Sequence, residues 1–236
     1  MDSYKEFMDC INRYNIVNET NLMLVVNAVH RRAHTNFGPI YHYDPTKCVF
    51  EGKYHSLSNE FKQNETSPSL EELCGKKGGV YLIFEDGETL DGFSRITRVG
   101  RSLDNLVGRL KEHFCPNTNR KTLPKDNSVF RKHIGKALLS QNGNSDEDKA
   151  NWNKKGETVD ELEDKISDLL AKKFSFCVIP LDDKDEIKIL EKTLIRLLST
   201  YNVRANAIPS PTWLGNAHPT EEIQKSGLWN VEHVII

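Results

Sequence analysis

Apolar residues recur every three or four positions in several stretches of the chain, a spacing that lines one face of a helix. The first 35 residues show this spacing twice, from Tyr4 to Ile11 and from Leu22 to Val29. Further helices are predicted after Ser102, which can cap one of them, over about 128–139, over 158–172, and from Asp182 or Asp183 onward. Much of the chain is therefore expected to be helical.

Three short runs have the composition of strands. Residues 80–84, 96–99 and 174–180 are rich in β-branched and aromatic side chains, and turn signals separate the first two runs. Residues 36–72 mix tyrosines with prolines, which allows either short strands or irregular packing. The order of the elements predicts a small α/β domain of the α+β type.

Composition shifts suggest three parts of the chain. Residues 1–72 are expected to form a largely helical extension, and 73–208 the main domain. Residues 209–236 are expected to form an irregular tail packed on that domain, with Trp213 and Trp229 as packing anchors. Within the main domain, 140–157 are polar and poor in apolar residues, which predicts a flexible insertion.

The composition favours a soluble cytoplasmic protein. No apolar run approaches the roughly 20 residues of a membrane helix, and the first residues are polar, unlike a signal peptide. The 5 cysteines lack CxxC spacing, which favours a reducing compartment over a zinc finger or a disulfide framework. No pattern indicates an oligomeric state.

Charge is distributed unevenly along the chain. The net charge is −2, yet residues 95–136 contain eleven Lys or Arg against three Asp or Glu, a local balance of +8. Such a segment is typical of a surface that meets phosphate, and equally of a solvated helix and loop. Charge alone leaves both interpretations open.

An ordered set of short motifs narrows the choice. The tripeptides Gly79-Val80-Tyr81 and Arg98-Val99-Gly100 lie on the first two predicted strands, and Arg109 and His113 lie in "GRLKEH". Glu191 lies in "LEKTLI" on a later predicted helix. In this order the motifs resemble the GIY-YIG nuclease domain, over about residues 75–206. The motifs are most similar to those of bacterial restriction-type or stand-alone members of this family.

The resemblance implies a three-stranded antiparallel sheet flanked by helices, and metal-dependent cleavage of DNA, expected to be double-stranded. The implied cofactor is Mg²⁺ or Mn²⁺, and the implied roles include restriction and repair. A hard divalent cation can be held by a single carboxylate together with waters. Glu191 is the candidate metal ligand, although a surface glutamate would look the same in sequence.

The other implied catalytic residues fit phosphodiester hydrolysis. Tyr81 would take a proton from water, and Arg109 would hold a nonbridging phosphate oxygen. His113, one turn after Arg109, could bind phosphate, shuttle a proton or assist the tyrosine. Arg98 is the main departure, because the family usually has tyrosine there. An arginine cannot act as a base, but it can bind phosphate and stabilise a neighbouring phenolate.

Further side chains are candidates for DNA contacts that would be salt-dependent. The family has an asparagine about a dozen residues after the glutamate; Asn202 and Asn206 both compete for that position, and Asn216 is a third option. The candidate DNA-binding residues are Arg101, Lys111, Arg131, Lys132, Lys136, Asn202 and Asn206. Two alternatives to a nuclease remain: a catalytically lapsed DNA-binding module, and an interaction protein with a similar domain.

Overall fold

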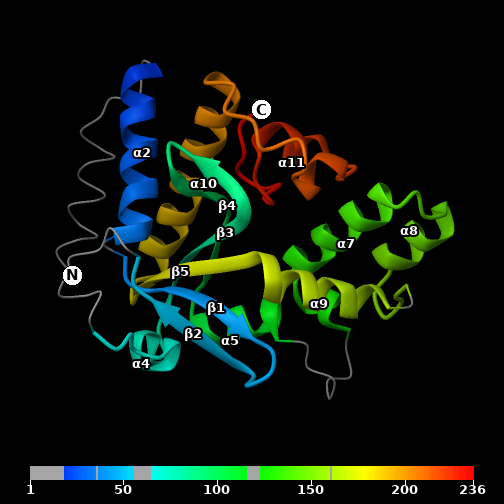
Figure 1. The fold of residues 1–236 in the computed structure, drawn as a ribbon, viewed down its shortest axis with the longest axis horizontal. Coiled ribbons are helices and arrows are strands. Elements are labelled where there is room, and N and C mark those ends of the chain that lie inside the picture. The colour runs from blue at the N-terminus through cyan, green and yellow to red at the C-terminus, as the bar shows by residue number, and fades with distance from the viewer. Residues whose placement is uncertain (1–18, 36, 56–64, 116–122, 160) are drawn as a thin grey trace.

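The computed structural model describes residues 19–35, 37–55, 65–115, 123–159 and 161–236 (Figure 1). The helix expected before residue 18 lies outside these residues. In chain order the elements are α2 (Glu19–Thr35), β1 (Ile40–Asp44), β2 (Val49–Lys53), α4 (Leu70–Cys74), β3 (Gly78–Leu90), β4 (Phe93–Ser102), α5 (Leu106–Phe114), α6 (Pro124–Asn127), α7 (Val129–Gln141), α8 (Asp146–Asn153), α9 (Leu162–Lys173), β5 (Phe174–Leu181), α10 (Lys184–Arg204), η1 (Leu214–Ala217) and α11 (Glu221–Ser226). None of the helices described is both long and apolar enough to cross a membrane.

The sheet is antiparallel and mixed with helices, as the resemblance implied, but it has five strands where three were expected. The strand order is β2-β1-β5-β3-β4, and every neighbouring pair is antiparallel. The three expected strands are β3, β4 and β5. The hairpin of β1 and β2 extends the sheet beyond β5, where Tyr41 pairs with Phe176. Its two strands of 5 residues each were too short to give a clear alternating pattern.

The two faces of the sheet are covered by different helices. Val80, Leu82 and Phe84 of β3 point toward α2 and α10, and this side is called the α10 face. Tyr81 and Ile83 point the other way, toward a core that includes residues of α5, α7 and α9, and this side is called the tyrosine face. Figure 1 shows α2 and α10 side by side, with α7, α8 and α9 gathered away from them.

The polar segment 140–157 is not the flexible insertion that its composition predicted. It contains helix α8, whose Trp152 is fully buried and donates its indole N–H to the carbonyl of Lys132 at 2.9 Å. The ammonium group of Lys125, also buried, donates to the carbonyl of Lys154 at 2.7 Å. One large aromatic residue thus docks a segment that is otherwise hydrophilic.

The last residues pack back onto the sheet. Trp213 and Trp229 are buried, and their indole N–H groups both donate to Oε2 of Glu85, at 2.9 and 3.0 Å. Asn230 pairs with the backbone of Val99 in both directions, donating at 2.8 Å and accepting at 3.1 Å. The tail therefore lies against β4, next to the second sequence motif.

Candidate active site

The two motif strands are neighbours, and their glycines fix the position of Tyr81. Tyr81 of β3 pairs with Gly100 of β4. A Cβ atom on Gly100 would lie 2.3 Å from both Cζ and Oη of the tyrosine, so the ring crosses β4 where no side chain stands. Gly79 has φ 151°, and a Cβ atom there would lie 2.4 Å from the carbonyl oxygen of Ile179. Both positions require glycine for close backbone approach.

The Tyr81 hydroxyl ends a short hydrogen-bonded chain. It lies 2.6 Å from Nε2 of His113, and Nδ1 of the same ring lies 2.7 Å from Oγ of Ser128. His113 is on α5 and is fully buried, whereas Ser128 caps the start of α7 by accepting the N–H of Arg131. Two helix positions therefore hold one imidazole behind the tyrosine.

Two arginines face the same hydroxyl. Arg98 and Arg109 both interact with Tyr81 through charge. Burial lowers the pKa of Arg98, and Tyr81 offsets part of this effect. Burial would also lower the pKa of Arg109, but Tyr81 and Glu112 raise it above its ordinary value. Both guanidinium groups thus stay charged beside the phenol oxygen.

These donors fix the direction of the hydrogen bonds. A guanidinium group can only donate, so the hydroxyl proton of Tyr81 is directed to Nε2 of His113. Nδ1 then carries the ring proton and donates it to Ser128. Burial and the charges of Arg109, Arg98 and Arg131 lower the pKa of His113 well below its ordinary value, which keeps the imidazole neutral and able to accept.

Arg98 is held from several sides. It is only 7% exposed, its Nη1 donates to the carbonyl of Trp229, and its Cζ lies 5.0 Å above the ring of Phe130. Its Nε–H has no hydrogen-bond partner among the residues described. Arg98 is therefore part of the buried cluster.

Glu191 of α10 is linked to the cluster through the charge of Arg98. Its carboxylate forms an ion pair with Arg101, and it also interacts with the charge of Arg98. Burial raises the pKa of Glu191, although Arg101, Arg98 and His233 oppose the change. The described residues contain no group of three or more His, Cys, Asp or Glu arranged to hold a metal. One carboxylate with water ligands still suits Mg²⁺, so Glu191 fits this cation as a single protein ligand.

Part of the basic segment 95–136 is buried and cannot form a surface for DNA. Arg95, Arg98, Lys125 and Arg131 are buried, and Arg120 and Lys121 lie outside the described residues. The expected DNA contact of Arg131 does not fit its position, because its guanidinium group pairs with Glu163 at 2.9 Å and donates to the carbonyl of His113. A count of charges in sequence could not separate buried cations from exposed ones.

The remaining candidate DNA-binding residues are scattered. Lys111 is exposed and paired with Glu71 at 2.8 Å, Lys132 donates to the carbonyl of Asn153, and Lys136 is half-buried. Asn202 is buried and donates to the carbonyl of Ser226 at 2.7 Å. Asn206 is exposed just beyond α10 with φ 49°.

Asn216 is exposed and donates to the carbonyl of Ser210 at 2.9 Å. Ser102 does not cap α5 directly: Asn105 is the cap, and Ser102 accepts the backbone N–H of Asn105. Among these asparagines, only Asn202 is part of the packed interior.

Comparison with known families assigns the chain to one of them. A family model described as GIY-YIG domain matches residues 51–235. The chain belongs to the GIY-YIG family. Domains of this family are generally DNA endonucleases and typically use divalent metals. No curated protein and no solved structure matched the chain.

Two groups in this GIY-YIG domain could not be read from the motifs. Ser128 carries a weak signal, because a serine directly before a predicted helix is a common cap, but nothing in the sequence connects it to His113. The carbonyl of Trp229, which binds Arg98, comes from 131 positions along the chain and has no side-chain signature.

Proposed function

We propose that this protein is a metal-dependent endonuclease that hydrolyses DNA phosphodiester bonds, with Tyr81 as the proton acceptor for the attacking water. One observation carries the proposal: the Tyr81 hydroxyl is bonded to a buried, neutral histidine and faces two guanidinium groups. A phenol alone is a weak base, but here the neighbouring imidazole of His113 can accept the hydroxyl proton.

The proposed proton path uses three side chains. As water attacks phosphorus, the Tyr81 oxygen accepts the proton of the water while its own hydroxyl proton moves to Nε2 of His113. The imidazolium formed keeps its Nδ1–H on Ser128. Because burial and the charges of three arginines disfavour a lasting imidazolium, the proton passes back through Tyr81 to solvent water once the P–O bond has broken, and solvent water protonates the leaving oxygen.

The arginines stabilise the charge that develops on phosphate. Arg109 presents a planar fork suited to a nonbridging oxygen, and the Nε–H of Arg98 has no partner in the described part of the chain. Glu191 would hold the divalent cation, which when bound supplies positive charge against the developing phosphorane. In this structure the guanidinium group of Arg101 is paired with the Glu191 carboxylate. We propose that Arg101 leaves Glu191 and binds a DNA phosphate when the cation binds.

A plasmid-nicking assay in Mg²⁺ and in Mn²⁺ tests this proposal. Tyr81→Phe keeps the ring and removes only the hydroxyl, so cleavage should fall by about 10²- to 10⁴-fold. The cleavage rate of Glu191→Gln should fall by a similar factor. Glu186→Gln changes an exposed position on the same helix and should cleave like the wild type. Equal nicking by wild type and Tyr81→Phe would refute the role of the tyrosine.

Double-stranded DNA is the proposed substrate, and restriction or repair the proposed role. Cleavage confined to one short sequence in intact plasmid would support restriction. Cleavage confined to damaged or branched duplexes would support repair. Faster cleavage of single strands than of duplexes would contradict the proposed substrate.

A catalytically lapsed DNA-binding module is the second candidate. Two observations favour it: Arg98 stands where the family usually has tyrosine, and Arg101 occupies the Glu191 carboxylate. This function predicts salt-dependent DNA binding by wild type and Glu191→Gln alike, with no cleavage in either metal. Any cleavage that Tyr81→Phe abolishes would exclude it.

A further inference from the structure

A pair of histidines lies beside Arg98 and takes no part in the proposed proton path. His133 of α7 and His218, which directly follows η1, have ring centroids 5.0 Å apart, and Nδ1 of His133 lies 3.0 Å from Nε2 of His218. His218 is fully buried, whereas His133 is partly exposed. The ring centroid of His218 also lies 6.3 Å from that of Trp229, whose carbonyl binds Arg98. The pair therefore adjoins the cluster around Tyr81.

The hydrogen bonds of the two rings assign their protons. The backbone N–H of Thr220 donates to Nδ1 of His218 at 3.0 Å, so this nitrogen carries no proton. Burial and the charge of Lys136 lower the pKa of His218 to about 4, so the ring is neutral and its proton is on Nε2. This Nε2–H donates to Nδ1 of His133. Burial and the charge of Arg98 lower the pKa of His133 to about 3, so this ring is also neutral and its own proton is on Nε2.

The Nε2–H of His133 is a donor with no hydrogen-bond partner among the residues that the structure describes. The atom is not one of the buried polar atoms that lack a partner, so it is open to solvent. Lys136, about one turn further along α7, is half-buried, and its ammonium group has no hydrogen bond or ion pair within the described ranges. Residues three apart on a helix lie side by side. The helix thus presents a neutral donor and a charged donor next to each other.

The charges around His133 are positive. Arg98, Lys136 and Lys132 each lower its pKa, and no carboxylate in the described part of the chain is among the causes of that shift. The ammonium group of Lys132 already donates to the carbonyl of Asn153 at 2.9 Å, which leaves Lys136 for a ligand. Donors in a positive field are suited to an anion, and many hydrogen bonds between proteins and DNA go to phosphate oxygens.

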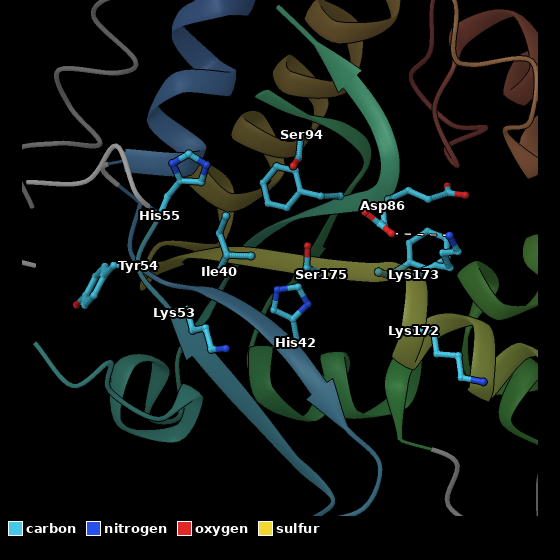
Figure 2. A pocket seen from close by; sticks show the side chains of 13 residues that line it. Ile40, His42, Lys53, Tyr54, His55, Asp86, Ser94, Lys172, Lys173 and Ser175 are labelled. Atoms are coloured by element: carbon cyan, nitrogen blue, oxygen red, sulfur yellow. Dashed lines mark ion pairs between the residues drawn. The ribbon is translucent and has the colours of Figure 1, made fainter. Parts of the chain in front are cut away.

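The cavity between β2 and α9 has the opposite arrangement. Figure 2 shows Lys53 and Lys173 on opposite sides of it, and Asp86 pairs with Lys173 at 3.7 Å. Glu85 also lines this cavity. Cations that are separated in this way and lie next to carboxylates cannot hold one phosphate together. The donors on α7 have neither defect.

Arg98 connects the donors on α7 with the proposed site of cleavage. Its Cζ lies 5.0 Å above the ring of Phe130, and the ring of His113 contacts that of Phe130 with centroids 5.8 Å apart. His133 follows Phe130 by about one turn of the same helix. Arg98 and His113 thus face the Tyr81 hydroxyl, while His133 lies one turn of α7 farther along. This displacement suits a phosphate next to the one that is cleaved.

We propose that His133 and Lys136 bind a DNA phosphate that neighbours the scissile phosphate, the imidazole through its Nε2–H and the lysine through its ammonium group. His218 is a positioning residue, because it holds the tautomer of His133 that carries its proton on Nε2. The proposal rests on DNA being the substrate, as in the proposed function, but it does not require cleavage. A neutral donor beside a charged one predicts two different responses to salt.

Fluorescence anisotropy of a labelled DNA duplex in EDTA at neutral pH, over a series of salt concentrations, tests the two donors. Lys136→Gln should weaken binding and make the slope of log K against log salt shallower by about 1, because one counterion-releasing contact is lost. His133→Asn should weaken binding about tenfold with an unchanged slope, because a neutral contact releases no counterion. Lys149→Gln is the matched control: this lysine of the neighbouring helix α8 is exposed and paired with Asp146, and its loss should change neither quantity.

Two variants of His133 separate phosphate binding from packing. The amide of asparagine reaches the place of Nδ1 and can still accept from His218, but it puts no donor at the place of Nε2. The amide of glutamine reaches the place of Nε2, so His133→Gln should recover most of the affinity that His133→Asn loses. Wild-type affinity in His133→Asn, or equal weakness of the two variants, would overturn the proposal. So would a wild type that does not bind the duplex.

The tautomer held by His218 has a spectroscopic test. The ¹⁵N NMR shifts of the His133 ring should show a proton on Nε2 in the wild type and a mixture of tautomers in His218→Leu. A wild-type ring protonated on Nδ1 would overturn the assignment. Plasmid nicking is scored separately. A protein that shows these binding responses without nicking would refute the nuclease and keep this site, whereas nicking with unchanged binding by His133→Asn would refute only this site.

Discussion

The two faces of strand β3 have different roles. On the α10 face, β3 contributes Val80, Leu82 and Phe84, which pack against helices through aliphatic and aromatic contacts. On the tyrosine face the same strand contributes Tyr81, and buried His113 and Arg98 surround its hydroxyl. A buried polar group costs free energy unless it has partners. The tyrosine face therefore depends on hydrogen-bond geometry, whereas the α10 face depends on volume.

The largest effect is expected at Arg131, which supports the tyrosine face from below. Arg131→Met leaves Oε2 of Glu163 and the carbonyl of His113 without the guanidinium donor, so the free energy of unfolding should fall by about 3–5 kcal/mol. Urea denaturation measures this change. Lys132→Gln, the partly exposed neighbour, should change it by about 0.5 kcal/mol or less. Equal, small effects would mean that the buried pair contributes little.

A second, slightly smaller effect concerns pH and Glu85. Burial raises the pKa of Glu85 to about 7, even though Trp229 and Trp213 donate to its carboxylate and oppose the shift. The unfolded-state value is near 4.5, so the carboxyl group binds its proton more tightly in the fold. Its contribution to stability is fully present below pH 4.5 and is lost as the pH rises through about 7.

Glu85→Gln removes this titration and keeps an amide oxygen to accept the indole N–H groups. Between those two pH values, the wild type should lose up to about 3 kcal/mol of unfolding free energy relative to the variant. Comparing the two proteins at each pH cancels the contributions of the histidines they share. A difference between the proteins that stays constant with pH would contradict the prediction.

The contrast between the faces also explains what the sequence could predict. The glycines and the tyrosine of the two motifs are local signals, and Tyr81 does pair with Gly100 as two neighbouring motif strands require. The partners of Arg98 and Glu85 come from the tail, more than 120 positions away, so no local pattern connects them. Burial of Arg131 could not be predicted either, because the residue type alone does not distinguish a buried arginine from an exposed one.

Gly100→Ala tests the close approach on the tyrosine face. The new methyl group would collide with Cζ and Oη of Tyr81, so the ring must move away from His113. Stability should fall by about 1–3 kcal/mol, and nicking by about 100-fold or more, because the proton path is broken. Both are measured on the same preparation.

Ile179→Val is the control for Gly100→Ala on the α10 face. Deleting one buried methylene should cost about 0.5–1.5 kcal/mol of stability without changing the cleavage rate. If both variants lost activity in proportion to stability, the proposed difference between the faces would be refuted.

Among the residues around Tyr81, the smallest effect is expected at Ser128, which has two roles that can be separated. Ser128→Ala removes the α7 cap and the acceptor for Nδ1 of His113, so stability should fall by about 0.5–2 kcal/mol. Nicking should fall by about tenfold, since the imidazole loses the group that sets its tautomer. Ser128→Thr keeps the hydroxyl and should restore both.

Ser128→Asn separates the role of helix cap from the role of hydrogen-bond partner to His113. Asparagine is a good cap, but it presents a different group to the imidazole. Stability should recover while the pH dependence of cleavage stays altered, since the proton affinity of His113 depends on the group at Nδ1. If stability and cleavage recovered together in Ser128→Asn, the serine would act only as a helix cap, and the proton path would end at His113.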